Sequence, residues 1–132
     1  MKVPGVTKAG SSCRRVVEGP DIYPSLLDVC GLPKAEHVEG VSFAPLLKAP
    51  ETSWKKGSLI YREMGKAVGL VTEQWRYNRF EGQPERDQLF DHQTDPAENI
   101  NLIKDSKYAA VVKELGTLMD SGWKGCLPTS AR

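Results

Sequence analysis

The chain has 132 residues, of which 39% are hydrophobic and 27% are charged, and its formal net charge is +1. This balance suits one globular domain, or a substantial piece of a larger one, and excludes a disordered tail. The near-neutral charge and the lack of any apolar run of about 20 residues argue against nucleic acid or a membrane as a partner.

The first part of the chain, residues 1–57, is expected to hold one helix between long loops. Asp21 can cap a helix over residues 21–30, with Pro24 in the first turn, where a missing N–H costs little. Gly31 is placed to end this helix in the left-handed conformation. The loop that follows carries apolar residues that would anchor it to a core.

The middle of the chain is rich in strands. Turn residues separate four short runs of β-branched and aromatic residues, which are residues 58–62, 67–72, 75–80 and 87–90. Because the links between them are short, the strands must pair antiparallel as a meander.

The end of the chain carries the clearest helical pattern. Asp95-Pro96 forms a turn, and apolar residues at helical spacing then predict a helix over residues 106–120, capped by Ser106 or Asp105. Residues 124–132 are expected to be a flexible tail. The predicted fold class is therefore α+β, with a subdomain of one antiparallel sheet and one covering helix at residues 58–123.

Four potential metal ligands gather in one turn: Asp91, His92, Asp95 and Glu98. Their spacing matches no EF-hand or zincin pattern, so a structural turn is favoured, with Asp95 as an Asx-type turn former and Glu98 as a cap. No metal ligand is assigned to this chain.

Three cysteines are present, and they fit neither a complete set of disulfides nor a zinc motif. Cys13 beside Arg14 and Arg15 resembles an activated thiolate, but without a base partner a surface thiol is favoured. Cys30 is expected to be a core residue of its helix. The first residues offer no signal-peptide pattern, and the compartment stays unknown.

The run Trp75-Arg76-Tyr77-Asn78-Arg79-Phe80 alternates aromatic with polar residues. This pattern favours a half-buried strand, with Trp75 and Tyr77 on one face, over a platform for bases or sugars.

Four segments, in this order and at this spacing, resemble the C-terminal end of sulfatases. The segment from Val17 to Pro33 is similar to "V-E-x-x-D-I-Y-P-T-L-L-D-L-x-G-L-P", and Glu39 to Leu47 is similar to "x-G-x-S-L-x-P-L-L". Trp75-Arg76-Tyr77 matches a "W-R-Y" strand, and Leu89 to Leu102 resembles "L-Y-D-x-x-x-D-P-x-E-x-x-N-L". The resemblance is closest to the iduronate-2-sulfatase-like and choline-sulfatase-like members of the alkaline-phosphatase superfamily.

The resemblance implies a two-part enzyme. A large α/β domain would hold a formylglycine, made within a C-x-P-x-R motif, and a calcium ion, and a smaller C-terminal subdomain would shape the substrate pocket. Residues 1–57 would be the remnant of that α/β domain. Full-length relatives are often periplasmic, secreted or lysosomal.

Several positions depart from the family pattern. Cys13 is followed by neither the Pro nor the Arg of the formylglycine motif. Val71 stands where relatives often carry Arg, and Phe90 replaces the usual Tyr. No catalytic residue or cofactor is therefore expected in this chain, and calcium and formylglycine are implied only for the full-length family.

The predicted function is that of a C-terminal fragment of a sulfuric ester hydrolase that shapes the substrate pocket and is inactive alone. Its partners would be a sulfate ester, small or glycan, and the missing N-terminal sulfatase domain. The candidates for substrate contact are Tyr61, Arg62, Arg76 and His92, although a plain surface or packing role is favoured for each.

Two alternatives stay open. One is a non-catalytic carbohydrate-binding or interaction module that uses Trp54, Trp75 and Tyr77 as a platform. The other is a fragment of a related phosphate-ester hydrolase of the same superfamily.

Overall fold

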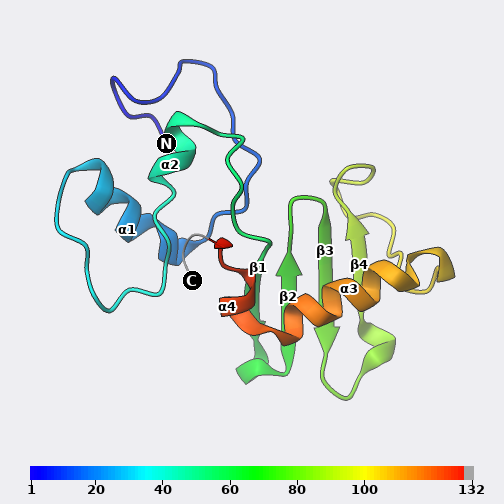
Figure 1. Ribbon diagram of the computed structural model, residues 1–132. Coiled ribbons are helices and arrows are strands. Elements are labelled where there is room, and N and C mark those ends of the chain that lie inside the picture. The colour runs from blue at the N-terminus through cyan, green and yellow to red at the C-terminus, as the bar shows by residue number, and fades with distance from the viewer. Residues whose placement is uncertain (130–132) are drawn as a thin grey trace. The chain divides into compact units, whose positions relative to one another are not determined.

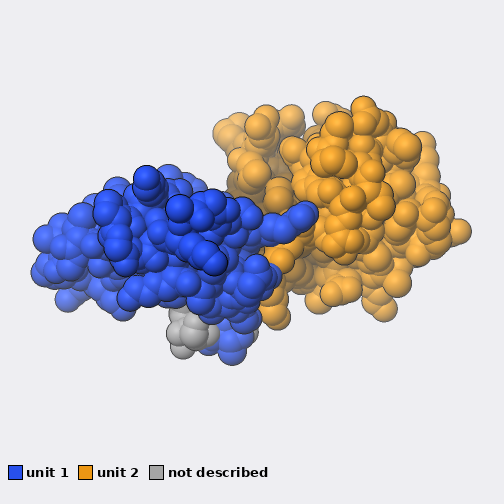
Figure 2. Space-filling model, turned by 90° about the horizontal axis from the view of Figure 1, so that it is seen from above, with its two compact units in different colours: residues 1–55, 127–132 blue, residues 56–126 orange. Residues whose placement is uncertain are grey.

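The computed structural model describes residues 1–129, which divide into two units (Figure 2). The first unit comprises residues 1–55 and the described residues from Leu127 onward, and the second comprises residues 56–126. No helix within residues 1–129 is long and apolar enough to cross a membrane.

The second unit is a sheet of four antiparallel strands in the order β1-β2-β3-β4 (Figure 1). The strands are β1 (Ser58–Arg62), β2 (Ala67–Val71), β3 (Trp75–Phe80) and β4 (Gln88–Asp91). Short 3₁₀ turns, Glu63–Gly65 and Pro84–Arg86, lie in two of the links. This meander, covered by a helix from the end of the chain, confirms the predicted α+β fold.

Helix α3 (Ala109–Asp120) lies across one face of this sheet (Figure 1). A 3₁₀ turn, Ser106–Tyr108, precedes it, and Asp105 caps that turn by accepting a hydrogen bond from the backbone N–H of Lys107. The core between sheet and helix contains six buried residues: Leu70, Tyr77, Leu89, Leu115, Met119 and Cys126. Because side chains alternate along a strand, the opposite face of the sheet carries the remaining residues of each strand.

In the first unit, helix α1 (Gly19–Val29) begins earlier than predicted. Its N-cap is Glu18, and Asp21 is the third helical residue, so the two side chains form a reciprocal capping box. The expectation that Asp21 is the cap and that Pro24 lies in the first turn is wrong. Pro20 occupies the first turn, and Pro24 lies inside the helix.

The end of α1 agrees with the prediction. Gly31 has φ +67°, and the N–H groups of Gly31 and Leu32 donate to the carbonyls of Asp28 and Leu27. These bonds form a Schellman motif, in which the left-handed residue is most often glycine. Cys30, expected in the core, is exposed, because nothing in the described residues covers that side of the helix end.

The loop after α1 docks back on the helix and leads into helix α2 (Ala44–Lys48). The backbone N–H of Val41 donates to Asp21 Oδ1, and that of Phe43 donates to Ser25 Oγ, each at 2.8 Å. Both acceptor residues are fully buried, so the loop satisfies polar groups that water cannot reach.

The chain does not fray at Lys124 as predicted. A further helix, α4 (Gly122–Cys126), follows α3, and Cys126 is 2% exposed in the core of the second unit. The expected tail is therefore wrong for residues 124–126, because Cys126 adds an apolar contact that the local pattern does not reveal. Residues 130–132 of that predicted tail lie outside the described residues.

Candidate functional site

The strand register assigns the predicted contact residues on β1 and β3 to different faces. Tyr61 pairs with Val68, and Val68 pairs with Arg79. Val68 and Arg79 are two positions from buried Leu70 and Tyr77 on their strands, so all of them lie on the same face. Tyr61 therefore belongs to the helix-covered face, although it lies on the edge strand and is 55% exposed. Arg62 and Arg76 belong to the opposite face, which we call the open face, and both line one pocket there.

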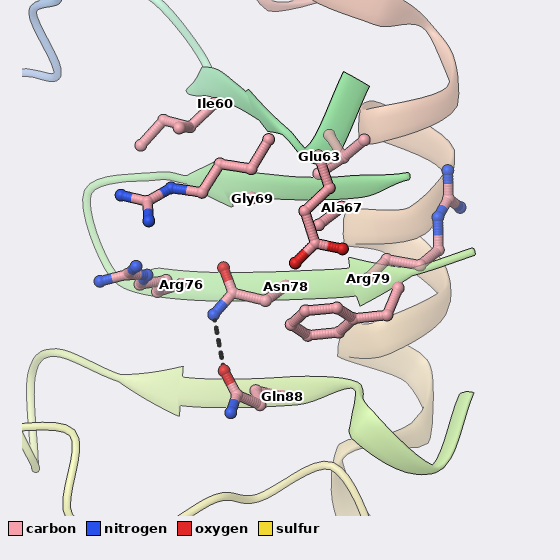
Figure 3. Close-up of a pocket in the computed structure, with 11 residues that line it drawn as sticks. Ile60, Glu63, Ala67, Gly69, Arg76, Asn78, Arg79 and Gln88 are labelled. Carbon is pink, nitrogen blue, oxygen red and sulfur yellow. Dashed lines mark hydrogen bonds between the residues drawn. The ribbon is translucent and has the colours of Figure 1, made fainter. Parts of the chain in front are cut away.

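The pocket on the open face has a volume of about 280 Å³. Its centre is a row of paired residues that crosses all four strands: Ile60, Gly69, Asn78 and Gln88 (Figure 3). On this face β2 contributes only Ala67 and Gly69 to the lining, whereas its neighbours carry long side chains. The missing side chain of Gly69 therefore leaves the hollow.

Two amide side chains form one wall of the pocket. Asn78 Nδ2 donates to Gln88 Oε1 at 2.9 Å, which links β3 to β4 (Figure 3). A Cβ atom on Gly69 would lie 2.9 Å from Asn78 Oδ1. Glycine at position 69 thus allows the Asn78 amide to lie over the neighbouring strand.

Glu98 joins two of the predicted contact residues. Arg76 Nη1 donates to both carboxylate oxygens of Glu98 at 3.2 Å, and His92 Nε2 lies 2.8 Å from Glu98 Oε1. Glu98 has φ +56°, which is uncommon for a residue with a side chain. The expectation that Glu98 caps a helical turn is wrong, because its carboxylate instead connects the loop after β4 to β3.

The surroundings of Glu98 favour its charged form. Burial by itself raises the pKa of Glu98, but the hydrogen bond with His92 and the nearby Arg76 guanidinium outweigh it and hold the pKa below its ordinary value. Arg76 Nε is buried and has no hydrogen-bond partner among the described residues. The guanidinium is therefore held along one edge only.

Asp95 forms the turn that was predicted for it. Its two carboxylate oxygens accept hydrogen bonds from the Asn99 side chain and the backbone N–H of Ile100, each at 2.8 Å. Within residues 1–129, no three His, Cys, Asp or Glu side chains are grouped so as to hold a metal ion.

Two of the three residues proposed as a platform in the carbohydrate-binding alternative, Tyr77 and Trp75, are engaged in packing. Tyr77 is 5% exposed in the core beneath α3, and the Trp75 ring packs edge-on against Tyr108 with centroids 5.7 Å apart. This packing confirms the strand interpretation of the alternating run. Cys13, in the first unit, is exposed, and its thiol lies 3.4 Å from the Pro50 carbonyl oxygen.

Residues 1–123 match the family described as N-sulphoglucosamine sulphohydrolase, C-terminal. The chain belongs to this family. It is 24% identical over 135 residues to N-acetylglucosamine-6-O-sulfatase of Bacteroides thetaiotaomicron, with 94% of this chain and 24% of that protein covered. It is 33% identical to arylsulfatase K of Canis lupus familiaris, with 77% of this chain and 21% of that protein covered.

Solved structures share the fold. A protein solved in complex with its substrate D-glucosamine-2-N,6-O-disulfate superposes with a TM-score of 0.65, at 24% identity, over 80% of this chain and 23% of that one. The phosphonate monoester hydrolase of Agrobacterium radiobacter gives a TM-score of 0.58 at 27% identity, over 76% of this chain and 23% of that one. The chain therefore spans about a quarter of the length of these sulfatase-family relatives.

Sequence reasoning missed Gly69 and the role of Glu98. Glu98 was considered as a metal ligand or a cap, and its contacts with Arg76 and His92 were not predicted. Gly69 interrupts an otherwise apolar strand, which often marks a place where another group approaches the backbone.

Proposed function

We propose that this chain is the C-terminal portion of a sulfuric ester hydrolase that acts on a sulfated sugar, and that it shapes the substrate pocket without carrying the catalytic groups. The observation that supports this is the family match over residues 1–123 in a chain that spans only about a quarter of its sulfatase relatives. The remaining three quarters of such an enzyme would supply the reacting centre.

The first unit is suited to contact that missing part. Helix α1 exposes three large apolar side chains, Ile22, Tyr23 and Leu26, at 51%, 54% and 45%. A solvated helix with such a face gains free energy when another layer of structure covers it. The proposed cover is the N-terminal α/β domain of the same enzyme.

The residues of this chain do not fit the cofactors that the family implies. Cys13, the cysteine considered for formylglycine, lacks the Pro and Arg of the motif, and the described residues hold no cluster suited to calcium. Formylglycine and calcium would therefore belong to the N-terminal domain, and no reaction step is assigned to this chain.

The proposed contribution to substrate binding comes from polar side chains of the second unit. Arg62 and Arg76 line the open-face pocket, and His92 is tied to Arg76 through Glu98. Guanidinium groups suit sulfate because they offer several N–H donors in a fixed plane. Tyr61 lies outside this pocket, on the edge strand of the sheet.

The test compares the purified 132-residue chain with the same chain supplied together with a sulfatase N-terminal domain. We expect no hydrolysis of an aryl sulfate by the chain alone, with or without added calcium, and turnover only when both parts are present. Metal-dependent hydrolysis by the chain alone would contradict the proposal.

A second candidate is a phosphate- or phosphonate-ester hydrolase of the same superfamily. It is favoured by the similarity to the phosphonate monoester hydrolase at 27% identity. The reconstituted protein is assayed with an aryl sulfate and, separately, with a phenyl phosphonate ester at equal concentration. The ester that is hydrolysed faster decides between the two functions.

A further inference from the structure

We propose that the open-face pocket is a binding site for one sulfated amino-sugar ring, and that this chain binds such a ring without help from a catalytic domain. The choice of a sulfated sugar rests on the proposed function, whereas the existence and position of the site rest on the geometry of the second unit. Every lining residue belongs to that unit.

The shape of the pocket comes from the small residues of β2. Ala67 and Gly69 form a low strip between the longer side chains of β1 and β3, such as Ile60 and Asn78 (Figure 3). A volume of about 280 Å³ lies at the lower end of ordinary ligand sites. The hollow therefore suits a single ring better than an extended chain.

The polar groups of the wall remain available to a ligand. Asn78 uses its Nδ2 donor, and Gln88 its Oε1 acceptor, in their mutual hydrogen bond. Asn78 Oδ1 and Gln88 Nε2 are therefore left without side-chain partners among the described residues. A paired acceptor and donor of this kind matches vicinal sugar hydroxyls, because each hydroxyl both donates and accepts. Phe80 adds an aromatic surface to the same lining.

Two neighbouring charges of opposite sign stand at the pocket without ion-pair partners. Arg79 is paired with Asp120 and Arg76 with Glu98, whereas Arg62 and Glu63 form no ion pair with any described residue. In Figure 3 the Glu63 carboxylate reaches across β2 toward Asn78. A ligand with one anionic and one cationic group would therefore satisfy both charges.

A sulfated amino sugar carries these groups on one ring. Its sulfate accepts charge-assisted hydrogen bonds from Arg62, its ammonium group donates to Glu63, and its hydroxyls meet the Asn78–Gln88 pair. An apolar ligand would leave all of these polar groups buried without partners, at a cost in free energy. The lining thus favours the sugar over a hydrophobic molecule.

The test is a titration of the 132-residue chain with glucosamine 6-sulfate, followed by the NMR signals of the side-chain amides of Asn78 and Gln88. We expect these signals and the Gly69 backbone amide to shift in a saturable way. Glucosamine, which lacks the sulfate, and glucose 6-sulfate, which lacks the amine, should each bind about tenfold more weakly, since one charged hydrogen bond is lost.

Variants locate the site. Arg62→Gln should weaken binding of glucosamine 6-sulfate about tenfold but leave the affinity for glucosamine unchanged. Lys113→Gln, an exposed residue of α3, removes the same charge from the helix and should change neither affinity. Gly69→Val should fill the hollow and abolish binding, while its amide spectrum reports whether the sheet is intact.

Three results would overturn the site: no saturable shift, equal affinity for the sulfated and unsulfated sugars, or shifts confined to residues outside the open face. None of them bears on the proposed hydrolysis of a sulfate ester, which is judged by turnover in the reconstituted protein. Conversely, the chain could bind glucosamine 6-sulfate while the reconstituted protein shows no turnover. That result would support the binding site and contradict the proposed hydrolase function.

Discussion

Lys55 Nζ lies 2.7 Å from Asp21 Oδ1, and the two side chains are 1% and 0% exposed. Lys55 also contacts Glu18, the N-cap of α1, so one ammonium group is shared by both carboxylates of the capping box. The contact ties the end of the first unit to the start of its helix. The ion pair also compensates the buried charges of Lys55 and Asp21 for their loss of hydration.

Replacing Lys55 by Met should therefore destabilise the first unit strongly. The variant keeps a similar volume but leaves Asp21 buried with an uncompensated charge, and removal of one partner of a buried pair costs about 3–5 kcal/mol. Urea unfolding, followed by the amide signals of α1, measures the loss. Lys56→Met, at the exposed neighbouring position, is the control, and equal stabilities of the two variants would contradict the prediction.

Gly40 tests the docking of the loop on α1. A Cβ atom at position 40 would lie 2.0 Å from the backbone carbonyl oxygen of Pro20, and this carbonyl cannot easily move because it belongs to the first turn of the helix. Gly40→Ala should therefore lower the free energy of unfolding by about 1–3 kcal/mol, as overpacking does.

Gly116 is the matched control for that substitution. It lies inside α3, and a Cβ atom there would meet no heavy atom within 4 Å. Gly116→Ala should stabilise the second unit by about 1 kcal/mol, because alanine favours the helix. The same substitution should thus lower the free energy of unfolding at position 40 and raise it at position 116. Thermal unfolding of each variant checks both.

The strands of the second unit were predictable because their signals are local. The predicted bounds of all four strands lie within one residue of those observed, since turn residues such as Gly65 and Pro84 interrupt the β-favouring runs. The start of α1 was not predictable in this way. Glu is an unusual N-cap, whereas Asp21 satisfies the N-cap preference when only the local sequence is considered.

The site was only partly predictable because its contacts are not local. Arg62 and Arg76 were named from their residue types, and the register brings them to one pocket. The link from Glu98 to Arg76 spans 22 positions and depends on how the loop after β4 folds back. The exposure of Cys30 could not be foreseen either, because an apolar helix side predicts burial without saying which residues provide it.

Acid should weaken the turn after β4. The hydrogen bond from the Ile100 backbone outweighs the raising effect of burial and, together with the hydrogen bond from the Asn99 side chain, holds the pKa of Asp95 below its ordinary value. The pKa of Glu98 is also lowered. Groups with a lowered pKa in the folded state contribute stability above their unfolded pKa, and this is lost as the pH falls through the folded value. The free energy of unfolding should therefore be level above about pH 5 and fall below about pH 4.

Glu98→Gln isolates one part of that effect. The variant cannot lose a carboxylate contact on acidification, so its stability should depend less steeply on pH below about 4 than that of the natural chain. Glu114→Gln, on the exposed side of α3, should leave the slope unchanged. Identical slopes for the natural chain and Glu98→Gln, measured by urea unfolding at several pH values, would show that the contacts of Glu98 do not contribute.

The two faces of the sheet should respond differently to the loss of an aliphatic side chain. Leu70 is fully buried beneath α3, whereas Ile60, on the neighbouring strand, is 44% exposed beside the open-face pocket. Leu70→Ala should lower the free energy of unfolding by about 2–5 kcal/mol, because it removes buried surface and leaves a cavity. Ile60→Ala should cost less than about 1 kcal/mol, since half of its side chain already meets water. Comparable losses for the two variants in urea unfolding would mean that the open face is covered in solution. In that case the hollow above Gly69 would not be accessible to a sugar.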